Sequence, residues 1–363
     1  MKLCAVEAIV AYPRDGGGHG IPLVQVHTDQ GLTGWGEAQA SRVPEAVCDI
    51  VRDLLNPALR NRTFHGSREE IEAAWDYLYG IIRTEAENGG FADIAIGAVD
   101  MALWDLAGKA QNRAVHQIVD GAAAPTEVEA FVELPCADST ALARSVQAMV
   151  GAGLDTFEIA FDSSTAELLA ALDFVERTLA EKGRVAVNGL WRLGPALDFG
   201  LQRQIDGRAP LWLANPLPPE DPFAHSRLAK GMCTPVALGE AYHTHYELAP
   251  FFREMAVGVL QPDLGRCGFT EALRMAEMAR SHSIPVVVRV GESLGPQLAA
   301  ALQFAAAAPG RRVEYQPGRV KMANRALATP IELSEGRYQV PNGPGLGIRI
   351  DEPEIHLMER EFA

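Results

Sequence analysis

The fold is decided by seven short apolar runs, each with a polar residue near its end: DTFEIA (155–160), RVAVNG (184–189), LWLANP (211–216), PVALGE (235–240), VGVLQPD (257–263), PVVVRV (285–290) and RRVEYQ (311–316). Stretches rich in Ala, Leu, Arg and Glu separate the runs and are typical of helices. The repeat of about 23 to 30 residues is the length of one strand–loop–helix–loop unit in a parallel sheet. With an earlier run, FVEL (131–134), the chain offers eight units, as many as a (β/α)₈ barrel needs.

The polar residues of these runs mark a candidate site. In a (β/α)₈ barrel the chemistry takes place at the carboxyl ends of the strands, so the residues at the run ends are expected to converge on one barrel mouth. These residues are Glu158, Asn188, Asn215, Glu240, Asp263, Arg289 and Glu314. The glycine-rich segment 14–22 is expected to lie over this mouth.

Residues 1–125 follow a different pattern, which predicts a small α+β domain. Strands are expected at about 24–28 and 32–38, and helices at about 43–55, 67–83 and 91–111. The last helix is apolar nearly all round, which predicts that it is buried, with Asp105 and Lys109 paired on its polar edge. We expect the tail, 330–363, to complete this capping domain, and residues 126–329 to form the barrel.

The composition argues against several classes of partner. The chain has 363 residues, 48% of them hydrophobic, with a net charge of −15 and a pI near 5.1. This acidic balance argues against binding to nucleic acid or to anionic membranes. No apolar run approaches the ~18–20 residues of a membrane-spanning helix. The five cysteines include no CxxC pair, which suits a reducing compartment, so we expect a cytoplasmic protein that acts on a small molecule.

Several segments of the chain resemble the enolase superfamily, in particular its mandelate racemase and muconate lactonizing enzyme branch. The segments are GLTGWGEA (31–38), AVDMALWDLAGKA (98–110), GEAYHTHYE (239–247), QPDLGRCGFTEALRMAEMA (261–279), IPVVV (284–288) and VPNGPGLGI (340–348). The resemblance implies an α+β capping domain over a (β/α)₇β barrel. It also implies abstraction of a proton alpha to a carboxylate, with the enolate held on Mg²⁺, and assembly as a homo-oligomer.

The chain departs from this family where the family carries its three acidic metal ligands. The matching positions are Ala186, Ala214 and Glu240, so one carboxylate of the three remains. Asn188 and Asn215 offer neutral oxygens nearby, but Mg²⁺ prefers an octahedral oxygen set anchored by carboxylates. We therefore expect no bound metal and no other cofactor.

The family's bases are also replaced. Its Lys-x-Lys pair corresponds to Glu158 and Ala160, and its Asp–His dyad corresponds to Asp263 and Arg289. Arginine stays protonated in proteins, so Arg289 cannot act as a general base in place of histidine. A carboxylate that is often present on the eighth strand of the family corresponds to Glu314.

The remaining acids favour proton transfer without a metal. Crowded carboxylates force at least one of them to hold its proton near neutral pH, and such a pair can serve as acid and base. We interpret the chain as a metal-independent isomerase or lyase that moves a proton on a small, neutral or cationic metabolite. The catalytic residues would be Asp263, Glu240, Glu158 and Glu314, with Arg289 stabilising charge. The substrate-binding residues would be Asn188, Asn215, His19, Tyr242, His243 and Trp191.

Two alternatives remain open at this point. In the first, Arg289 forms salt bridges that replace the missing metal structurally, and the protein is a catalytically silent homologue that binds a small molecule or a partner. In the second, the protein is an ordinary Mg²⁺-dependent acid-sugar dehydratase or racemase. That second alternative conflicts with Ala186 and Ala214.

Overall fold

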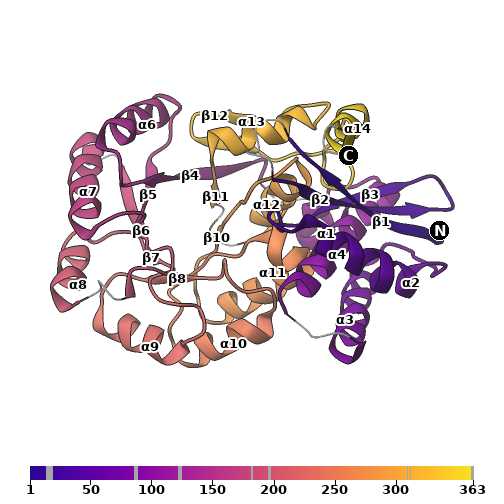
Figure 1. Cartoon of the computed structure of the whole chain (residues 1–363), viewed down its shortest axis with the longest axis horizontal. Helices are drawn as coiled ribbons and strands as arrows, with labels where there is room; N and C mark the ends of the chain where they lie inside the picture. The colour runs from indigo at the N-terminus through magenta and orange to yellow at the C-terminus, as the bar shows by residue number, and fades with distance from the viewer. Residues whose placement is uncertain are drawn as a thin grey trace.

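The molecule combines a barrel with a smaller unit beside it. The structure is a computed structural model that describes residues 1–13, 19–85, 89–121, 125–180, 183–194, 198–308, 310 and 312–360. Within these ranges, parallel strands form a closed barrel ringed by helices, and an α+β unit packs against one side (Figure 1). The predicted (β/α)₇β barrel with an α+β capping domain is thereby confirmed.

The barrel strands coincide with the apolar runs. They are β4 (Glu127–Pro135), β5 (Thr156–Ala160), β6 (Arg184–Asn188), β7 (Leu213–Ala214), β8 (Val236–Leu238), β9 (Val259–Leu260), β10 (Val287–Val288) and β11 (Arg312–Glu314). Successive strands from β4 to β9 pair in parallel, and so do β10 with β11 and β11 with β4. A bridge between Leu260 and Val286 joins β9 to the start of β10, which closes the barrel.

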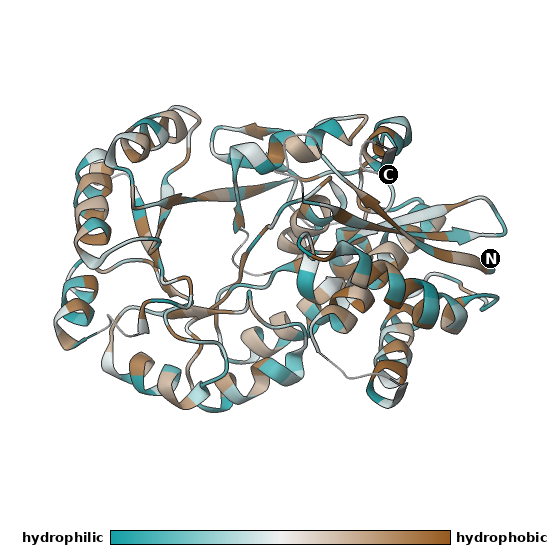
Figure 2. Cartoon of the chain, in the orientation of Figure 1, coloured by the Kyte–Doolittle hydropathy of each residue, from teal (hydrophilic) through white to brown (hydrophobic). Residues whose placement is uncertain are grey.

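Helices alternate with these strands and cover the outside of the barrel. They are α6 (Ser139–Gly151), α7 (Thr165–Leu179), α8 (Phe199–Asp206), α9 (Pro222–Gly231), α10 (His245–Arg253), α11 (Leu264–Ser281), α12 (Pro296–Ala307) and α13 (Pro317–Arg325). Figure 2 shows hydrophilic and hydrophobic residues mixed on most of these helices, as expected when one face packs on the strands. Ser164 and Asp221 each accept a hydrogen bond from the first turn of the following helix, which fixes where that helix begins.

The interior of the barrel is filled with apolar side chains. They are Phe131, Ala186, Trp212, Ala214, Ala237, Val259 and Val287. The rings of Phe131 and Trp212 meet edge to face, with centroids 5.7 Å apart. Ala186 and Ala214 therefore belong to this dry filling, and polar groups on the same strands lie nearer the carboxyl ends.

The capping unit is built on a three-stranded antiparallel sheet. Its elements are β1 (Leu3–Ala11), β2 (Ile21–Thr28), β3 (Thr33–Glu37), α1 (Pro44–Ile50), the π-helix η1 (Val51–Leu55), α2 (Asn56–Leu59), α3 (Arg68–Glu85), α4 (Phe91–Gln111) and α5 (Val115–Asp120). The tail contributes β12 (Leu333–Ser334), β13 (Arg337–Gln339) and α14 (Glu352–Arg360). β13 pairs with β4 of the barrel, whereas α14 packs against β1 of the capping sheet, so the tail contacts both units.

Helix α4 connects the two units. It is buried nearly all round, as its apolar sequence predicts, and packs against both β3 and α11. The predicted pair of Asp105 and Lys109 forms at 2.6 Å. Asp100 reaches across to α11, where it accepts hydrogen bonds from the backbone N–H groups of Phe269 (2.8 Å) and Thr270 (2.7 Å). The capping unit is therefore held to the barrel by buried hydrogen bonds as well as by apolar packing.

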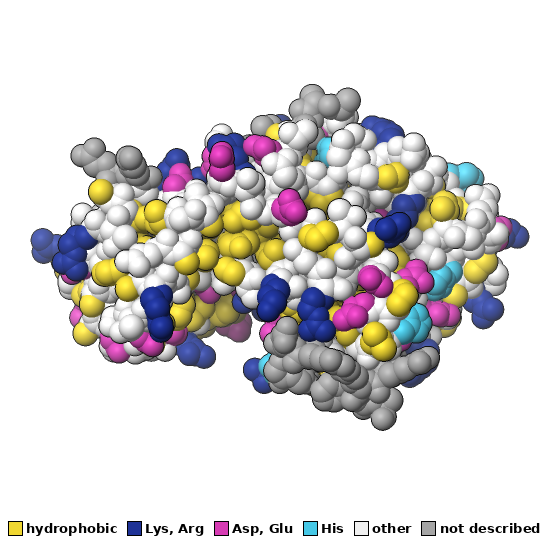
Figure 3. Space-filling model, turned by 90° about the horizontal axis from the view of Figure 1, so that it is seen from above, with side chains coloured by type: hydrophobic (Ala, Val, Ile, Leu, Met, Phe, Trp, Pro, Cys, Tyr) yellow, Lys and Arg dark blue, Asp and Glu magenta, His cyan; other side chains and the backbone are white. Residues whose placement is uncertain are grey.

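The surface carries both signs of charge. On the face drawn in Figure 3, basic and acidic side chains lie interspersed around a central group of hydrophobic side chains. Among the helices that the structure describes, none combines the length and the apolar character needed to cross a bilayer.

The contact between β3 and α4 generates a stability prediction. A Cβ atom on Gly36 would lie 1.9 Å from the carbonyl oxygen of Ala98, so Gly36→Ala must push α4 away from the sheet. We expect a loss of about 1–3 kcal/mol or more in the free energy of unfolding. Gly80→Ala is the matched control, because a Cβ there meets nothing within 4 Å and alanine favours a helix interior by roughly 0.5–1 kcal/mol. Thermal melts in which both variants behave alike would contradict this account of the packing.

Candidate active site

Arg289 lies at the centre of the barrel mouth and is ringed by acids. Among the described side chains, four carboxylates pair with its guanidinium, and we call these five residues the Arg289 cluster. Nη1 donates to Glu158, and Nη2 donates to Glu133 over 2.6 Å. Nε lies 3.3 Å from Glu314 and 3.5 Å from Glu240. The Arg289 side chain is only 5% exposed, so these contacts are poorly screened by water.

Strand register brings the cluster together. Glu133 on β4 and Glu158 on β5 are direct neighbours in the parallel pairing, and Glu314 ends β11. Arg289 directly follows β10, and Glu240 comes two residues after β8. Because all the strands of a parallel barrel end on the same rim, inward-pointing residues at these positions must meet.

Neutral donors complete the cluster. The amide of Asn188 donates to Glu133 at 2.5 Å, and the amide of Asn215 donates to Glu240 at 2.9 Å. Below them, Nε1 of Trp212 donates to Glu158 at 2.5 Å. These contacts orient the acids, and the two asparagines take up positions at the mouth as the sequence predicts.

The two neighbouring acids Glu133 and Glu158 are shifted in opposite directions. Burial raises the pKa of Glu158, and the nearby charge of Glu133 adds to the rise although Arg289 opposes it. Burial also acts on Glu133, but the charge and hydrogen bond of Arg289 outweigh it and lower its pKa. The opposed directions favour a protonated Glu158 beside an ionised Glu133. Opposed shifts of this kind are typical of acid–base pairs.

Asp263 lies on the same rim as Arg289 but makes no ion pair with it among the described contacts, and its catalytic role stays a prediction. Its backbone is paired with that of Arg289, but its carboxylate faces the start of α11. There Oδ1 accepts hydrogen bonds from Gly265 N (2.9 Å) and from the side chain of Gln297 (2.7 Å). Burial raises the pKa of Asp263 to about 7, Arg266 opposes the rise, and the charge of Glu240 adds to it. Asp263 therefore caps a helix and does not pair with Arg289.

The other predicted binding residues are spread more widely. The backbone N–H of Trp191 donates to the carbonyl of Asn215 at 2.8 Å, which puts Trp191 at the edge of the mouth. Tyr242 donates its hydroxyl to Pro219, and His243 lies beside Glu247 on α10, so neither side chain is seen to contact the cluster. His19 is half-buried. Residues 14–18 of the expected covering segment lie outside the described residues.

Glu133 was not predicted from the sequence. The run FVEL that contains it was counted as a strand, but its polar residue was not placed among the site residues. A usable signal is present, because Glu133 lies near the end of its run, as Glu158 and Glu314 lie near the ends of theirs.

The residues at the mouth do not fit a Mg²⁺ ion. Ala186 and Ala214 stand where two carboxylate ligands would be required, and both belong to the apolar filling of the barrel. The third position, Glu240, is already bonded to Asn215 and lies beside the guanidinium of Arg289. Mg²⁺ needs several hard oxygen ligands in octahedral geometry, and this arrangement supplies a cationic side chain instead.

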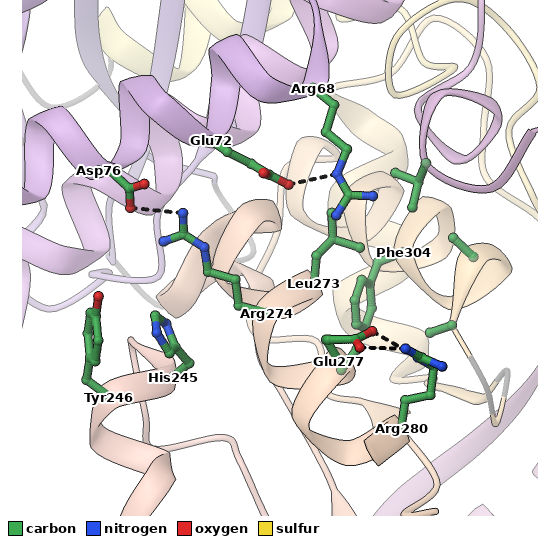
Figure 4. Close-up of a pocket in the computed structure, with 14 residues that line it drawn as sticks. Arg68, Glu72, Asp76, His245, Tyr246, Leu273, Arg274, Glu277, Arg280 and Phe304 are labelled. Atoms are coloured by element: carbon green, nitrogen blue, oxygen red, sulfur yellow. Dashed lines mark hydrogen bonds and ion pairs between the residues drawn. The ribbon is translucent and has the colours of Figure 1, made fainter.

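A separate groove of about 590 Å³ runs between α3, α10 and α11 (Figure 4). Charged side chains line it, and they pair with one another: Arg68 with Glu72, Arg274 with Asp76, and Arg280 with Glu277. The groove shares no lining residue with the Arg289 cluster, and we assign it no chemistry.

Comparison with known families agrees with this architecture. Residues 141–354 match the family described as enolase C-terminal domain-like. Residues 19–119 match the mandelate racemase / muconate lactonizing enzyme N-terminal domain. The two matches together span both the capping unit and the barrel.

Similar proteins share the whole length of the chain. D-galactarolactone cycloisomerase of Agrobacterium fabrum is 28% identical over 346 residues, which cover 91% of this chain and 88% of the relative. D-galactonate dehydratase of Variovorax paradoxus is 26% identical, with 92% and 89% covered. The crystal structure of an enolase-superfamily member from Agrobacterium tumefaciens aligns with a TM-score of 0.89 at 25% identity, covering 98% of both chains.

The cluster generates a prediction about charge. Arg289→Met leaves the buried carboxylates without a positively charged partner. Because breaking a buried ion pair costs about 3–5 kcal/mol, we expect a large loss of stability at pH 7. In the folded variant, the pKa values of these unpaired glutamates would lie above roughly 4.3, the value in the unfolded chain. As pH rises the unfolded chain then loses protons first, so stability falls with rising pH and is partly recovered near pH 5.

Arg319→Met is the matched control for this experiment. Arg319 also contacts Glu314, at 3.2 Å, but its side chain is 38% exposed. Exposed pairs contribute about 0–1 kcal/mol, so this variant should melt close to the parent at every pH. If Arg289→Met also melts like the parent from pH 5 to 8, Arg289 is not the charge that organises the site.

Proposed function

We propose a function from one premise: the chain belongs to the enolase superfamily, in its mandelate racemase and muconate lactonizing enzyme branch. The similar proteins include a cycloisomerase of a sugar-acid lactone and dehydratases of sugar acids. These names support isomerase or lyase chemistry on a small polyhydroxylated acid or its lactone. Our proposal is a metal-independent isomerase or lyase that moves a proton on such a molecule.

The observation that carries the proposal is the pair of Glu133 and Glu158 on either side of one guanidinium. Glu158 is fully buried, which raises its pKa, whereas the side chain of Glu133 is 17% exposed and its pKa is lowered by Arg289. Glu133 is thus the group that can touch a substrate and accept a proton from it. Glu158 and Arg289 influence the charge of Glu133 during this proton transfer.

A second partly exposed acid, Glu240, lies at the mouth. Glu240 lies at the Nε edge of Arg289, away from the Nη2 group that binds Glu133, and its side chain is 16% exposed. An isomerisation or elimination needs one group that removes a proton and one that donates a proton. Glu133 would remove the proton, and the carboxylic acid so formed would return it to another atom of the substrate or to the leaving group; Glu240 would contact the substrate from the other side.

The charge of the mouth bears on the substrate. The Arg289 cluster contains four acids and one arginine, so even with Glu158 protonated it does not attract an anion. An uncharged substrate such as the lactone of an aldonic acid, which has no second carboxyl group, fits this site better than a free sugar acid. The galactarolactone named for the cycloisomerase shares the lactone ring of such a substrate but keeps one carboxylate, so charge alone does not favour it over the aldonates.

Two other functions have a specific observation in their favour. The near-complete burial of Arg289, Glu158 and Glu314 suits a silent homologue in which the ion pairs replace a metal structurally. The names of the dehydratase relatives suit the Mg²⁺-dependent alternative, which the alanines at positions 186 and 214 oppose.

Isotope exchange separates these three functions. The protein is incubated in D₂O with a panel of aldonates, aldonolactones and aldarolactones, with EDTA or with Mg²⁺, and loss of C–H signal is followed by proton NMR. We expect exchange on a lactone that EDTA leaves unchanged and that Glu133→Gln slows by about 100-fold or more. Glu129→Gln is the control on the same strand, because Glu129 pairs with Arg312 and lies outside the cluster.

Each other result selects another function. Exchange that requires Mg²⁺ would support the dehydratase or racemase and overturn the proposal. Ligand-induced stabilisation without exchange would support the silent binder. Equal rates in Glu133→Gln and Glu129→Gln would remove Glu133 from the mechanism.

A further inference from the structure

A second polar cluster lies where the capping unit meets the barrel, outside the Arg289 cluster. Asp93 on α4, His243 in the loop after β8, and Glu247 on α10 each present one ligand atom, and these atoms all lie within 4.8 Å of one another. The stacked rings of Tyr79 on α3 and Tyr246 on α10, 5.9 Å apart, show how closely α10 approaches the capping helices.

Asp93 is the unusual member of this set. It is only 5% exposed, yet among the described residues its Oδ1 atom has no hydrogen-bond partner. A buried carboxylate oxygen without a partner is costly, and an unseen ion or water is a common reason for one. Nδ1 of His243 is buried without a hydrogen bond as well, and lies 3.4 Å from Glu247. Two of the three ligands thus have free coordinating atoms.

The loop that carries His243 is held in place by its own hydrogen bonds. Thr244 caps α10, and Glu247 returns a hydrogen bond to the backbone N–H of His243 at 2.7 Å. His243 and Glu247 also line a cavity of about 430 Å³ together with Tyr242 and Phe251. The cluster is therefore ordered on one side and reachable from solvent on the other.

We propose that Asp93, His243 and Glu247 bind one divalent transition-metal ion, of the Zn²⁺ or Mn²⁺ class. An imidazole nitrogen with two carboxylate oxygens suits these ions, whereas Mg²⁺ and Ca²⁺ prefer oxygen alone. The two carboxylates balance the charge of the ion. Bonds of about 2.0–2.2 Å require the three side chains to close in slightly, and water would complete the coordination.

Such an ion would position the loop that reaches the barrel mouth. His243 follows Glu240 by three residues, so an ion held by His243 and Asp93 ties this loop to the first turn of α4. The ion would strengthen a loop position that the hydrogen bonds of the loop already hold, so its removal should leave proton transfer at the Arg289 cluster unchanged. This proposal is independent of the function proposed for the Arg289 cluster.

Metal stoichiometry tests the proposal. The full chain is equilibrated with Zn²⁺ or Mn²⁺ and dialysed, and bound metal is measured by mass spectrometry for the parent, Asp93→Asn and His243→Ala. We expect about one more ion per chain in the parent than in either variant, and a Zn²⁺-dependent rise in melting temperature that both variants lose. His65→Ala is the control, because His65 pairs with Glu70 on the surface and should not affect binding.

A third ligand variant keeps the test decisive if Asp93→Asn or His243→Ala folds poorly. Glu247→Gln changes a half-exposed ligand and provides a third measurement of bound metal, and circular dichroism verifies that each variant is folded. Equal metal content in the parent and in all the folded ligand variants would overturn the proposal. So would a loss of metal in His65→Ala as large as in His243→Ala, because binding would then be a general property of surface histidines.

Discussion

The arrangement of the barrel mouth depends on the single positive charge of Arg289. Four carboxylates at the ends of neighbouring strands would repel one another strongly in a site from which water is largely excluded. The guanidinium offsets this repulsion because it can donate to several acids at once from a flat, rigid group. The asparagines and Trp212 then fix the acids around it. Remove the arginine, and the acids can share one site only by binding protons.

Much of this arrangement could be predicted from the sequence, because barrel geometry is periodic. Once the strands are recognised, their ends must share one rim, so Glu158, Glu240, Arg289 and Glu314 could be placed together. Glu133 obeys the same rule but precedes the regular series of runs, and was missed for that reason. The orientation of the Asp263 side chain toward the start of α11 is harder to predict, although an aspartate just before a helix is a known capping signal.

The loop after β8 shows where prediction from sequence fails. Tyr242 and His243 follow Glu240 closely, and proximity in the chain suggested that they also face the mouth. The capping motif of Thr244 and Glu247 starts α10 at once, and Tyr242 packs against Phe251 of that helix. His243 then meets Asp93, which lies about 150 residues earlier in the chain. Such a contact results from the packing of the two units and cannot be predicted from a local sequence pattern.

The proposed replacement of a divalent ion by arginine changes what the site can do. A metal ion offers open coordination positions and two positive charges, whereas arginine offers five N–H donors and one charge that pH does not alter. With one positive charge fewer, the surrounding acids must retain more protons near neutral pH. Glu158 is the acid in which burial and the charge of Glu133 favour this outcome most clearly. In this proposal the site lacks a metal ion that could polarise a substrate carboxylate. It has instead a carboxyl group that favours its protonated form, Glu158, next to an ionised base, Glu133. This arrangement suits proton transfer on an uncharged molecule, and it suits an acidic substrate poorly.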